Sequence, residues 1–245
     1  MIEFRQVSKV YGKGNKKALD GLTLKVGEGC VYGFLGPNGA GKTTAIRILT
    51  GALEATDGTV LVNGTDVREH PLEVKRQIGF VPDSQDMYDR LTGMEYLNFM
   101  ADLFGVSAAE RKERADRYLA MFEMQEAVRQ RMQSYSRGMK QKMAVMGALI
   151  HEPKVFVLDE PMVGLDPKAA FLLKEEMRRR ADAGVTVFFS THVLEVAEKL
   201  CDRVGIIHHG KLLAEGSPDE LRHRMGDESL EDVFLEMTES GAEAQ

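Results

Sequence analysis

Gly36-Pro37-Asn38-Gly39-Ala40-Gly41-Lys42-Thr43 has the pattern G-x-x-x-x-G-K-T. The apolar run Cys30–Leu35 precedes it and the helix-like Thr44–Thr50 follows it, which is the strand–loop–helix context that the pattern needs. Glycines let backbone N–H groups turn toward an anion, and the start of a helix adds partial positive charge. The stretch therefore predicts a phosphate-binding loop in an α/β core, and a glycine-rich turn that matches by accident is the minor alternative.

In such a loop the lysine reaches the β- and γ-phosphates of a nucleotide and the hydroxyl after it binds Mg²⁺. We expect Lys42 and Thr43 to take these parts. The residues expected to contact the nucleotide in this stretch are Gly36, Pro37, Asn38, Gly39, Ala40, Gly41, Lys42, Thr43 and Thr44.

Composition is typical of an intracellular globular protein. The chain has 245 residues and a formal net charge of −6, from 32 basic and 38 acidic residues, so we expect no general attraction to nucleic acid or anionic lipid. Cys30 and Cys201 form no C-x-x-C pair and are expected to be inert core thiols in a reducing compartment. Met1–Arg5 does not resemble a signal peptide, and no apolar stretch approaches the ~20 residues that a membrane span requires.

Two kinds of strand are predicted. Ile2–Val7 and Leu22–Val26 alternate apolar and polar residues, which is typical of half-buried antiparallel strands, and the Asn63-Gly64 pair after Thr59–Val62 indicates a hairpin. Short apolar runs predict a parallel sheet that is covered on both faces. These runs are Cys30–Leu35, Val155–Leu158 and Val185–Phe189.

Helical signals lie between and after the strands. Ser107 and Glu110 form a predicted capping box, after which Ala115, Tyr118, Leu119 and Phe122 recur at helical spacing. Met139–Ile150 is predicted as a further helix, so residues 83–150 read as a helical insertion. Ser217-Pro218-Asp219-Glu220 predicts another helix start, and residues 227–240 a last amphipathic helix.

A second motif supplies carboxylates. In Val155-Phe156-Val157-Leu158-Asp159-Glu160 a buried strand ends in two acids, at the edge where open α/β sheets bind ligands. Asp159 is expected to hold Mg²⁺, and Glu160 to polarise an attacking water, a contribution of about 10²–10⁴-fold in rate. Taken alone, adjacent acids after a strand also suit a helix cap.

His192 ends the buried run Val187–His192 at the same edge. It could contact the γ-phosphate and hold the water in line, although a single histidine at a strand end often has a structural role only.

The ordered set of motifs resembles the ATP-binding-cassette (ABC) ATPases over residues 1–225. The set consists of the phosphate loop, Tyr135-Ser136-Arg137-Gly138-Met139, Asp159-Glu160, Gly164-Leu165-Asp166 and Ser190-Thr191-His192. The resemblance implies a P-loop NTPase core with a parallel sheet, an N-terminal antiparallel β subdomain and an inserted helical subdomain. It implies a single ABC ATPase domain, with residues 1–82 and 151–216 as core and β subdomain, 83–150 as helical insertion and 217–245 as C-terminal helices and tail.

The resemblance also implies roles. Tyr11 corresponds to the aromatic residue that stacks on adenine, and Ser136 and Gly138 to the groups that meet the γ-phosphate bound by a second copy. ATP binding would therefore produce a homodimer. Asp166 belongs to the loop that crosses the dimer interface, although Asp166-Pro167 also suits an N-cap followed by a first-turn proline.

Two positions depart from the family pattern. The common Leu-Ser-Gly-Gly-Gln is replaced by Tyr-Ser-Arg-Gly-Met at residues 135–139, but the phosphate-facing Ser136 and Gly138 remain. The glutamine expected after Val81-Pro82 is replaced by Asp83, which could bind Mg²⁺ or water, while Gln85 could take the glutamine's part instead.

The variant at residues 135–142 and the tail Ser229–Phe234 are similar to the bacterial sodium, drug and antibiotic exporter branch. That branch implies a separate polytopic membrane subunit, contacted by residues 83–104, and a peripheral location on the cytoplasmic face of the cell membrane. Internal packing is the other explanation for the apolar residues of 83–104.

Rival classes lack support in the sequence. A soluble ABC ATPase of DNA repair or translation is expected to carry long coiled coils or two cassettes, and neither feature nor a basic face is evident. A GTPase or kinase is opposed by Asp159-Glu160 and the Ser136 motif. A binding module without catalysis is opposed by the presence of Lys42, Asp159, Glu160 and His192.

Overall fold

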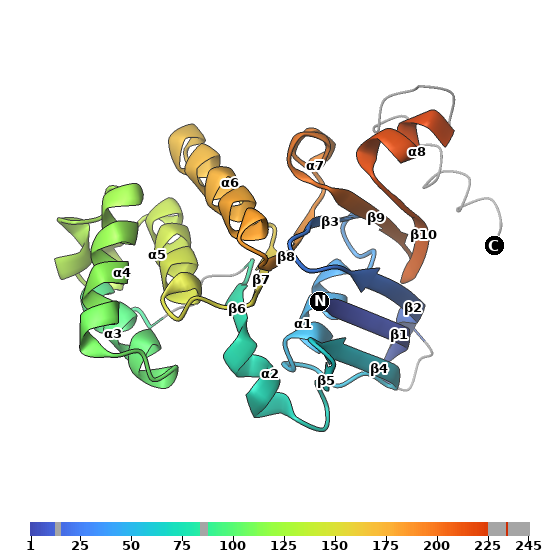
Figure 1. The fold of residues 1–245 in the computed structure, drawn as a ribbon, viewed down its shortest axis with the longest axis horizontal. Helices are drawn as coiled ribbons and strands as arrows, with labels where there is room; N and C mark the ends of the chain where they lie inside the picture. Colours follow the sequence, from blue (N-terminus) through green and yellow to red (C-terminus); the bar gives the residue numbers. More distant parts are fainter. Residues whose placement is uncertain (13–15, 84–87, 225–233, 235–245) are drawn as a thin grey trace.

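The computed structural model describes residues 1–12, 16–83, 88–224 and 234. It contains two sheets with helices around them (Figure 1). The predicted last helix at 227–240 lies outside the described residues, except for Phe234, which packs on the core.

A six-stranded sheet in the order β10-β9-β3-β8-β7-β6 forms the centre. Its five strands from β9 to β6 are parallel and β10 pairs antiparallel with β9 at the edge, so the predicted parallel sheet is confirmed. Its strands are β3 (Val31–Leu35), β6 (Ile78–Val81), β7 (Val155–Asp159), β8 (Thr186–Thr191), β9 (Arg203–His208) and β10 (Lys211–Gly216).

Both faces of this sheet are buried, because successive residues of one strand enter different cores. Phe156 and Leu158 of β7 join the apolar cluster formed with the helices, whereas Val155 and Val157 join the cluster shared with the antiparallel sheet. This division explains why the strand reads as a continuous apolar run rather than as an alternating one.

The second sheet is antiparallel, in the order β2-β1-β4-β5. Its strands are β1 (Ile2–Tyr11), β2 (Lys16–Val26), β4 (Asp57–Val62) and β5 (Thr65–Asp66). The predicted hairpin is confirmed, since Asn63 (φ 50°) and Gly64 (φ 83°) form its turn. The first two strands are longer than predicted, because β1 pairs with β2 as far as Tyr11 and Lys16, across register shifts that follow Phe4, Val7 and Lys9.

Helices α3, α4 and α5 gather at one end of the molecule, on the left of Figure 1. The predicted capping box of α4 is confirmed, since Ser107 and Glu110 satisfy each other's backbone N–H groups, and Tyr118 and Leu119 of its apolar face are buried. The subdomain boundaries given above stay a prediction. The three helices are α3 (Gly93–Leu103), α4 (Ala108–Met121) and α5 (Arg137–Leu149).

The remaining helices lie around the two sheets. They are α1 (Lys42–Leu49), α2 (Pro71–Gln77), α6 (Pro167–Asp182), α7 (Leu194–Leu200) and α8 (Pro218–Arg224), the last with the predicted Ser217–Glu220 capping contacts. Within the described ranges, each helix is too short or too polar to cross a membrane.

Both cysteines fit the predicted inert character. Cys201 is buried and Cys30 partly so, and they are free thiols. Burial raises the pKa of Cys30 to about 11 and raises that of Cys201 further, so both remain protonated and unreactive at neutral pH.

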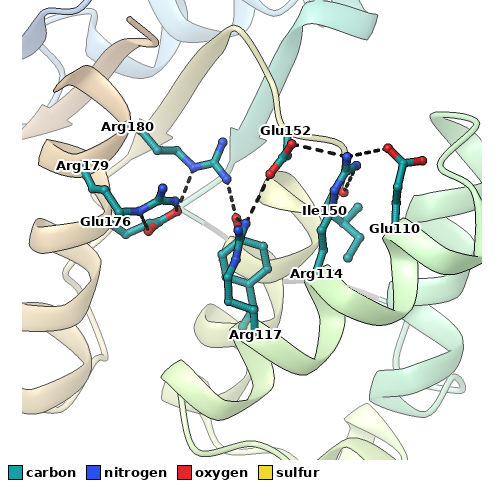
Figure 2. A network of polar contacts seen from close by, with 9 residues as sticks. Glu110, Arg114, Arg117, Ile150, Glu152, Glu176, Arg179 and Arg180 are labelled. Atoms are coloured by element: carbon teal, nitrogen blue, oxygen red, sulfur yellow. Dashed lines mark hydrogen bonds and ion pairs between the residues drawn. The ribbon is translucent and has the colours of Figure 1, made fainter. Parts of the chain in front are cut away.

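A buried polar network joins α6 to α4 (Figure 2). The carboxylate of Glu176, which is 2% exposed, accepts hydrogen bonds from Arg179 (2.8 and 2.6 Å) and Arg180 (2.8 Å). Burial alone would raise the pKa of Glu176, but the bonds from Arg179 and Arg180 outweigh it and lower the pKa. Arg180 in turn donates to the buried hydroxyl of Tyr118 on α4, so the ion pair reaches the helical part of the chain.

The network continues toward solvent along α4. Arg117 donates to the Tyr118 hydroxyl (2.6 Å) and to Glu152 (3.4 Å). Arg114 pairs with Glu152 (3.3 Å) and Glu110 (2.9 Å) and donates to the backbone carbonyl of Ile150 (3.1 Å). The α5–β7 connection is thus held to α4 by charge-assisted bonds, which are stronger than neutral ones.

Glu176→Ala should lower the free energy of unfolding by about 3 kcal/mol or more, because it leaves Arg180 buried without a counter-charge. Chemical denaturation followed by circular dichroism measures this loss. The neighbouring Glu175 is exposed, so Glu175→Ala should change stability by less than about 0.5 kcal/mol. Equal effects of the two substitutions would contradict the importance of the buried pair.

Candidate functional site

The phosphate loop follows β3 and ends in α1, as the sequence predicts. Gly41 caps the helix with φ 114°, and a Cβ atom on it would come within 2.6 Å of the Ala18 carbonyl oxygen. Only glycine combines that backbone conformation with so close an approach. Asn38, Gly39 and Thr43 are exposed at the mouth of the loop, so their backbone and side-chain donors are free to meet a ligand.

A hollow of about 190 Å³ lies over this loop. It is bounded by Ala18 of β2, by the loop and by the carboxylate residues Asp83 and Glu160. The residues that line it from the loop and α1 are Pro37, Asn38, Gly39, Gly41, Lys42, Thr43 and Thr44. Gly36 and Ala40 are buried beneath the loop surface.

Lys42 is 6% exposed, and burying an unpaired ammonium group is costly. Its Nζ donates to the carbonyl oxygen of Gly36 and, at 3.4 Å, to that of Pro37. It also lies 3.3 Å from Oε1 of Glu160. That contact is an ion pair without hydrogen-bond geometry, since Oε1 has no hydrogen-bond partner among the described residues.

Glu160 lies at the carboxyl edge of the sheet with φ 48°, a conformation that costs free energy for a residue with a side chain. Its second carboxylate oxygen, Oε2, is 3.0 Å from Nδ1 of His192. The carboxylate is therefore placed between the buried amine of Lys42 and the half-exposed imidazole of His192. The structure thus brings Lys42, Glu160 and His192 together at one edge of the sheet, while their catalytic roles stay a prediction.

Asp159 is 2% exposed and pairs in register with Ser190 of β8. The Ser190 hydroxyl donates to Oδ1 of Asp159 (2.5 Å) and accepts from the backbone N–H of Glu160 (3.0 Å). One hydroxyl thus fixes both acidic residues. This role of Ser190 was not predicted from the sequence, although a serine in a buried strand directly before Thr191-His192 is a signal that could have identified it.

Asp83 is exposed and lines the same hollow as Glu160, just after the neighbouring strand β6. Gln85, the alternative candidate for the same role, lies outside the described residues. Tyr11 is 45% exposed at the end of β1, and Lys9 Nζ lies 5.6 Å from its ring centre. Tyr11 is not among the residues that line the hollow, so its contact with adenine stays a prediction.

Ser136 and Gly138 begin α5 and lie outside the set of residues that line the hollow. Ser136 is exposed, and its hydroxyl caps the helix by accepting from the Met139 N–H (3.2 Å). One chain therefore does not bring these two residues to its own phosphate loop. The arrangement agrees with the expectation that they serve a second copy.

Asp166 caps α6, as its sequence context also allowed. Its carboxylate accepts from the Ala169 N–H (2.8 Å) and pairs with Lys142 (3.0 Å). The Ala169 N–H and then Lys142 lower the pKa of Asp166.

A larger hollow, of about 400 Å³, lies where α1 ends, between β4, β5 and α2. It lacks the loop donors and the Lys42–Glu160–His192 group. Chemistry rather than volume therefore identifies the site at the phosphate loop.

Comparison with known proteins agrees with this geometry. The family model described as ABC transporter matches residues 19–163. The daunorubicin/doxorubicin resistance ATP-binding protein DrrA of Streptomyces peucetius is 38% identical over 244 residues, which cover 100% of this chain and 73% of the relative.

Two solved structures share the fold. The ATP-binding subunit of an ABC transporter superposes with a TM-score of 0.92 and 32% identity, covering 97% of this chain and 99% of the other. A dimeric post-hydrolysis state of an ATP-binding cassette bound to ADP and Pi superposes with a TM-score of 0.79 and 26% identity, covering 89% and 98%.

Lys42→Ala should abolish measurable ATP binding in titration calorimetry. Among the described residues, Lys42 is the only cation that is buried in the phosphate loop, and the substitution removes it. Lys25→Ala, which removes an exposed lysine of β2, should bind ATP as the wild type does. Unchanged affinity in the Lys42 variant would contradict the proposed phosphate contact.

Proposed function

The chain belongs to the ABC transporter family as an ATP-hydrolysing subunit, and we propose that it drives export through a separate polytopic membrane subunit. The observation that supports the catalytic part most directly is the Glu160 carboxylate held between Lys42 and His192. We infer the direction of transport, export, from a relative that is named for resistance to daunorubicin and doxorubicin.

The phosphate loop is proposed to hold the nucleotide phosphates. Lys42 then exchanges its contacts with Gly36, Pro37 and Glu160 for contacts with the β- and γ-phosphates. This exchange keeps the buried ammonium group compensated in both states. It also frees the Glu160 carboxylate, so Glu160 becomes available as a base only when nucleotide is bound.

Mg²⁺ suits the oxygen donors beside the loop, because it prefers carboxylate, hydroxyl and phosphate oxygens. Asp159, buried and oriented by Ser190, and the exposed hydroxyl of Thr43 would hold it. Asp83, which also lines the hollow, is a further candidate. When bound, the ion would neutralise charge on the β- and γ-phosphates.

Glu160 is proposed to take the proton of the attacking water. His192 Nδ1 contacts the same carboxylate, and it restricts the rotation of Glu160 so that the free oxygen faces the phosphate. His192 is half exposed and is therefore accessible to the γ-phosphate as well. General-base assistance of this kind is worth about 10²–10⁴-fold in rate.

A second copy is proposed to complete each site. Ser136 is exposed at the start of α5 and does not line the hollow, and a helix N-terminus attracts phosphate. In a head-to-tail pair they would meet the γ-phosphate bound by the partner copy. ATP then supplies the attraction between two copies that each carry a charge of −6, and hydrolysis removes it.

The membrane subunit is proposed to contact an apolar patch formed by Tyr88, Phe99 and Leu103. These side chains are 53%, 41% and 64% exposed, and the rings of Tyr88 and Phe99 lie 5.2 Å apart. Phe99 and Leu103 are one helical turn apart on α3. Internal packing, the other explanation for this segment, holds for Tyr96 and Leu97, which are buried.

Glu160→Gln should accumulate as an ATP-bound dimer, because binding is retained while proton removal is lost. Light scattering after gel filtration with Mg-ATP measures the mass, and phosphate release measures hydrolysis. Glu175→Gln, on the exposed face of α6, serves as the control and should hydrolyse ATP normally. A Glu160 variant that stays monomeric and hydrolyses at the wild-type rate would overturn the catalytic assignment.

A photo-crosslinking amino acid in place of Phe99 should form an adduct with a polytopic membrane protein in intact cells. The same amino acid in place of Leu72, which is 73% exposed on α2, should not. The adducts are identified by mass spectrometry. Equal labelling from both positions, or labelling of soluble proteins only, would refute the proposed contact.

A further inference from the structure

Gln141 is a buried polar side chain in the middle of α5. It is 1% exposed, and its Nε2 donates to the backbone carbonyl of Pro161 at 3.0 Å. Pro161 directly follows Glu160 in the loop that joins β7 to α6, residues 160–166. A single amide thus connects the helix that begins at Ser136 to the residue beside the proposed base.

The same helix touches the 160–166 loop at its first turn. A Cβ atom on Gly138 would lie 2.6 Å from the carbonyl oxygen of Gly164, far inside van der Waals contact. Only a glycine at 138 lets the loop backbone lie against the helix start. Arg137 also packs on Gly164, whose nearest side-chain neighbours are atoms of that arginine.

A third contact holds the end of the loop. Lys142 Nζ is 3.0 Å from Oδ2 of Asp166, which caps α6 with its other oxygen. At its beginning the loop is held by the bond from the Glu160 N–H to Ser190. The loop is therefore fixed to the sheet at one end and to α5 at its middle and far end.

Stability alone does not account for the glutamine. Its Oε1 is buried and has no hydrogen-bond partner among the described residues, which is destabilising. A methionine of similar length would remove that penalty but would leave the Pro161 carbonyl without this donor. The two effects are similar in size and opposite in sign, so the exchange should change thermal stability little.

We propose that Gln141 is a positioning residue, which ties the Glu160–Pro161 turn to the helix start that carries Ser136 and Gly138. The inference rests on the proposed function, in which Ser136 and Gly138 meet the partner copy's nucleotide. When that nucleotide draws the start of α5 into place, Gln141 moves the Pro161 carbonyl with it and sets Glu160 in the chain's own site. The nucleotide bound by the partner copy thereby affects the position of Glu160 in the site of the first copy.

The test is steady-state ATP hydrolysis by Gln141→Met in the full chain, with the melting temperature measured on the same samples. We expect kcat to fall about fivefold to tenfold, the size of effect that one hydrogen bond supplies. KM should change less than twofold, because Gln141 does not line the nucleotide hollow, and the melting temperature should stay close to that of the wild type. Gln133→Met, an exposed position ahead of the same helix, is the matched control and should leave all three unchanged.

A wild-type kcat in Gln141→Met would overturn the proposal, and so would a fall in kcat that is matched by a fall in melting temperature. If Gln141→Met does not fold, Gln141→Glu serves as the second variant. It keeps the length and replaces the donating NH₂ by an accepting oxygen, so the same fall in kcat is expected and normal turnover would overturn the proposal.

Failure of this inference is distinguishable from failure of the proposed function. If Glu160→Gln forms the ATP-bound dimer while Gln141→Met turns over normally, only the role of Gln141 is refuted. If Glu160→Gln hydrolyses ATP as a monomer, the proposed function itself is wrong, and the role of Gln141 is wrong with it.

Discussion

The ammonium group of Lys42 is almost completely removed from water, and this is tolerable only while oxygens surround it. In the structure those oxygens belong to Gly36, Pro37 and Glu160. A nucleotide offers more negative charge at the same place, so the loop is prepared for phosphate and is compensated without it. The need to compensate the buried ammonium group also explains where Glu160 lies. Its carboxylate, the proposed base, pairs with Lys42, the proposed phosphate ligand.

The rest of the fold holds that pair in place. The Asp159–Ser190 bond and the bond from the Glu160 N–H to the same hydroxyl fix the acids at the sheet edge. The buried network of Glu176, Arg180 and Tyr118 joins α6, which follows the Glu160 loop, to α4 (Figure 2). These contacts join the helical end of the described chain to the sheet edge that carries Glu160.

Local patterns in the sequence predicted the parts of the structure that depend on neighbouring residues. The phosphate loop, the buried strands and the cap of α4 are of this kind, since glycine spacing, apolar runs and the Ser107–Glu110 pair carry their own signals. Thr92 and Glu95 form the same box at the start of α3, and that signal was available in the sequence. The lengths of β1 and β2 were underestimated, because pairing between strands extends them beyond the region that alternates.

Contacts between distant segments could not be predicted in this way. Ser190 and Asp159 are 31 residues apart, Gln141 and Pro161 are 20 apart, and Arg180 and Tyr118 are 62 apart. Each of these bonds exists only because packing of the sheet and helices brings the elements together. The resemblance to a family suggests roles for Ser136 and His192, but the three-dimensional structure is needed to see that Ser136 does not line the chain's own hollow.

Because Ser136 lies outside the chain's own hollow, mixing two variants shows whether each site is shared between two copies. Lys42→Ala removes one copy's phosphate contact but leaves its Ser136, whereas Ser136→Arg blocks the helix start but leaves the phosphate loop. Each variant alone should lack ATP hydrolysis, and an equal mixture should regain it, because one pairing restores one complete site. Full activity of Ser136→Arg alone, or a mixture that stays inactive, would contradict the account.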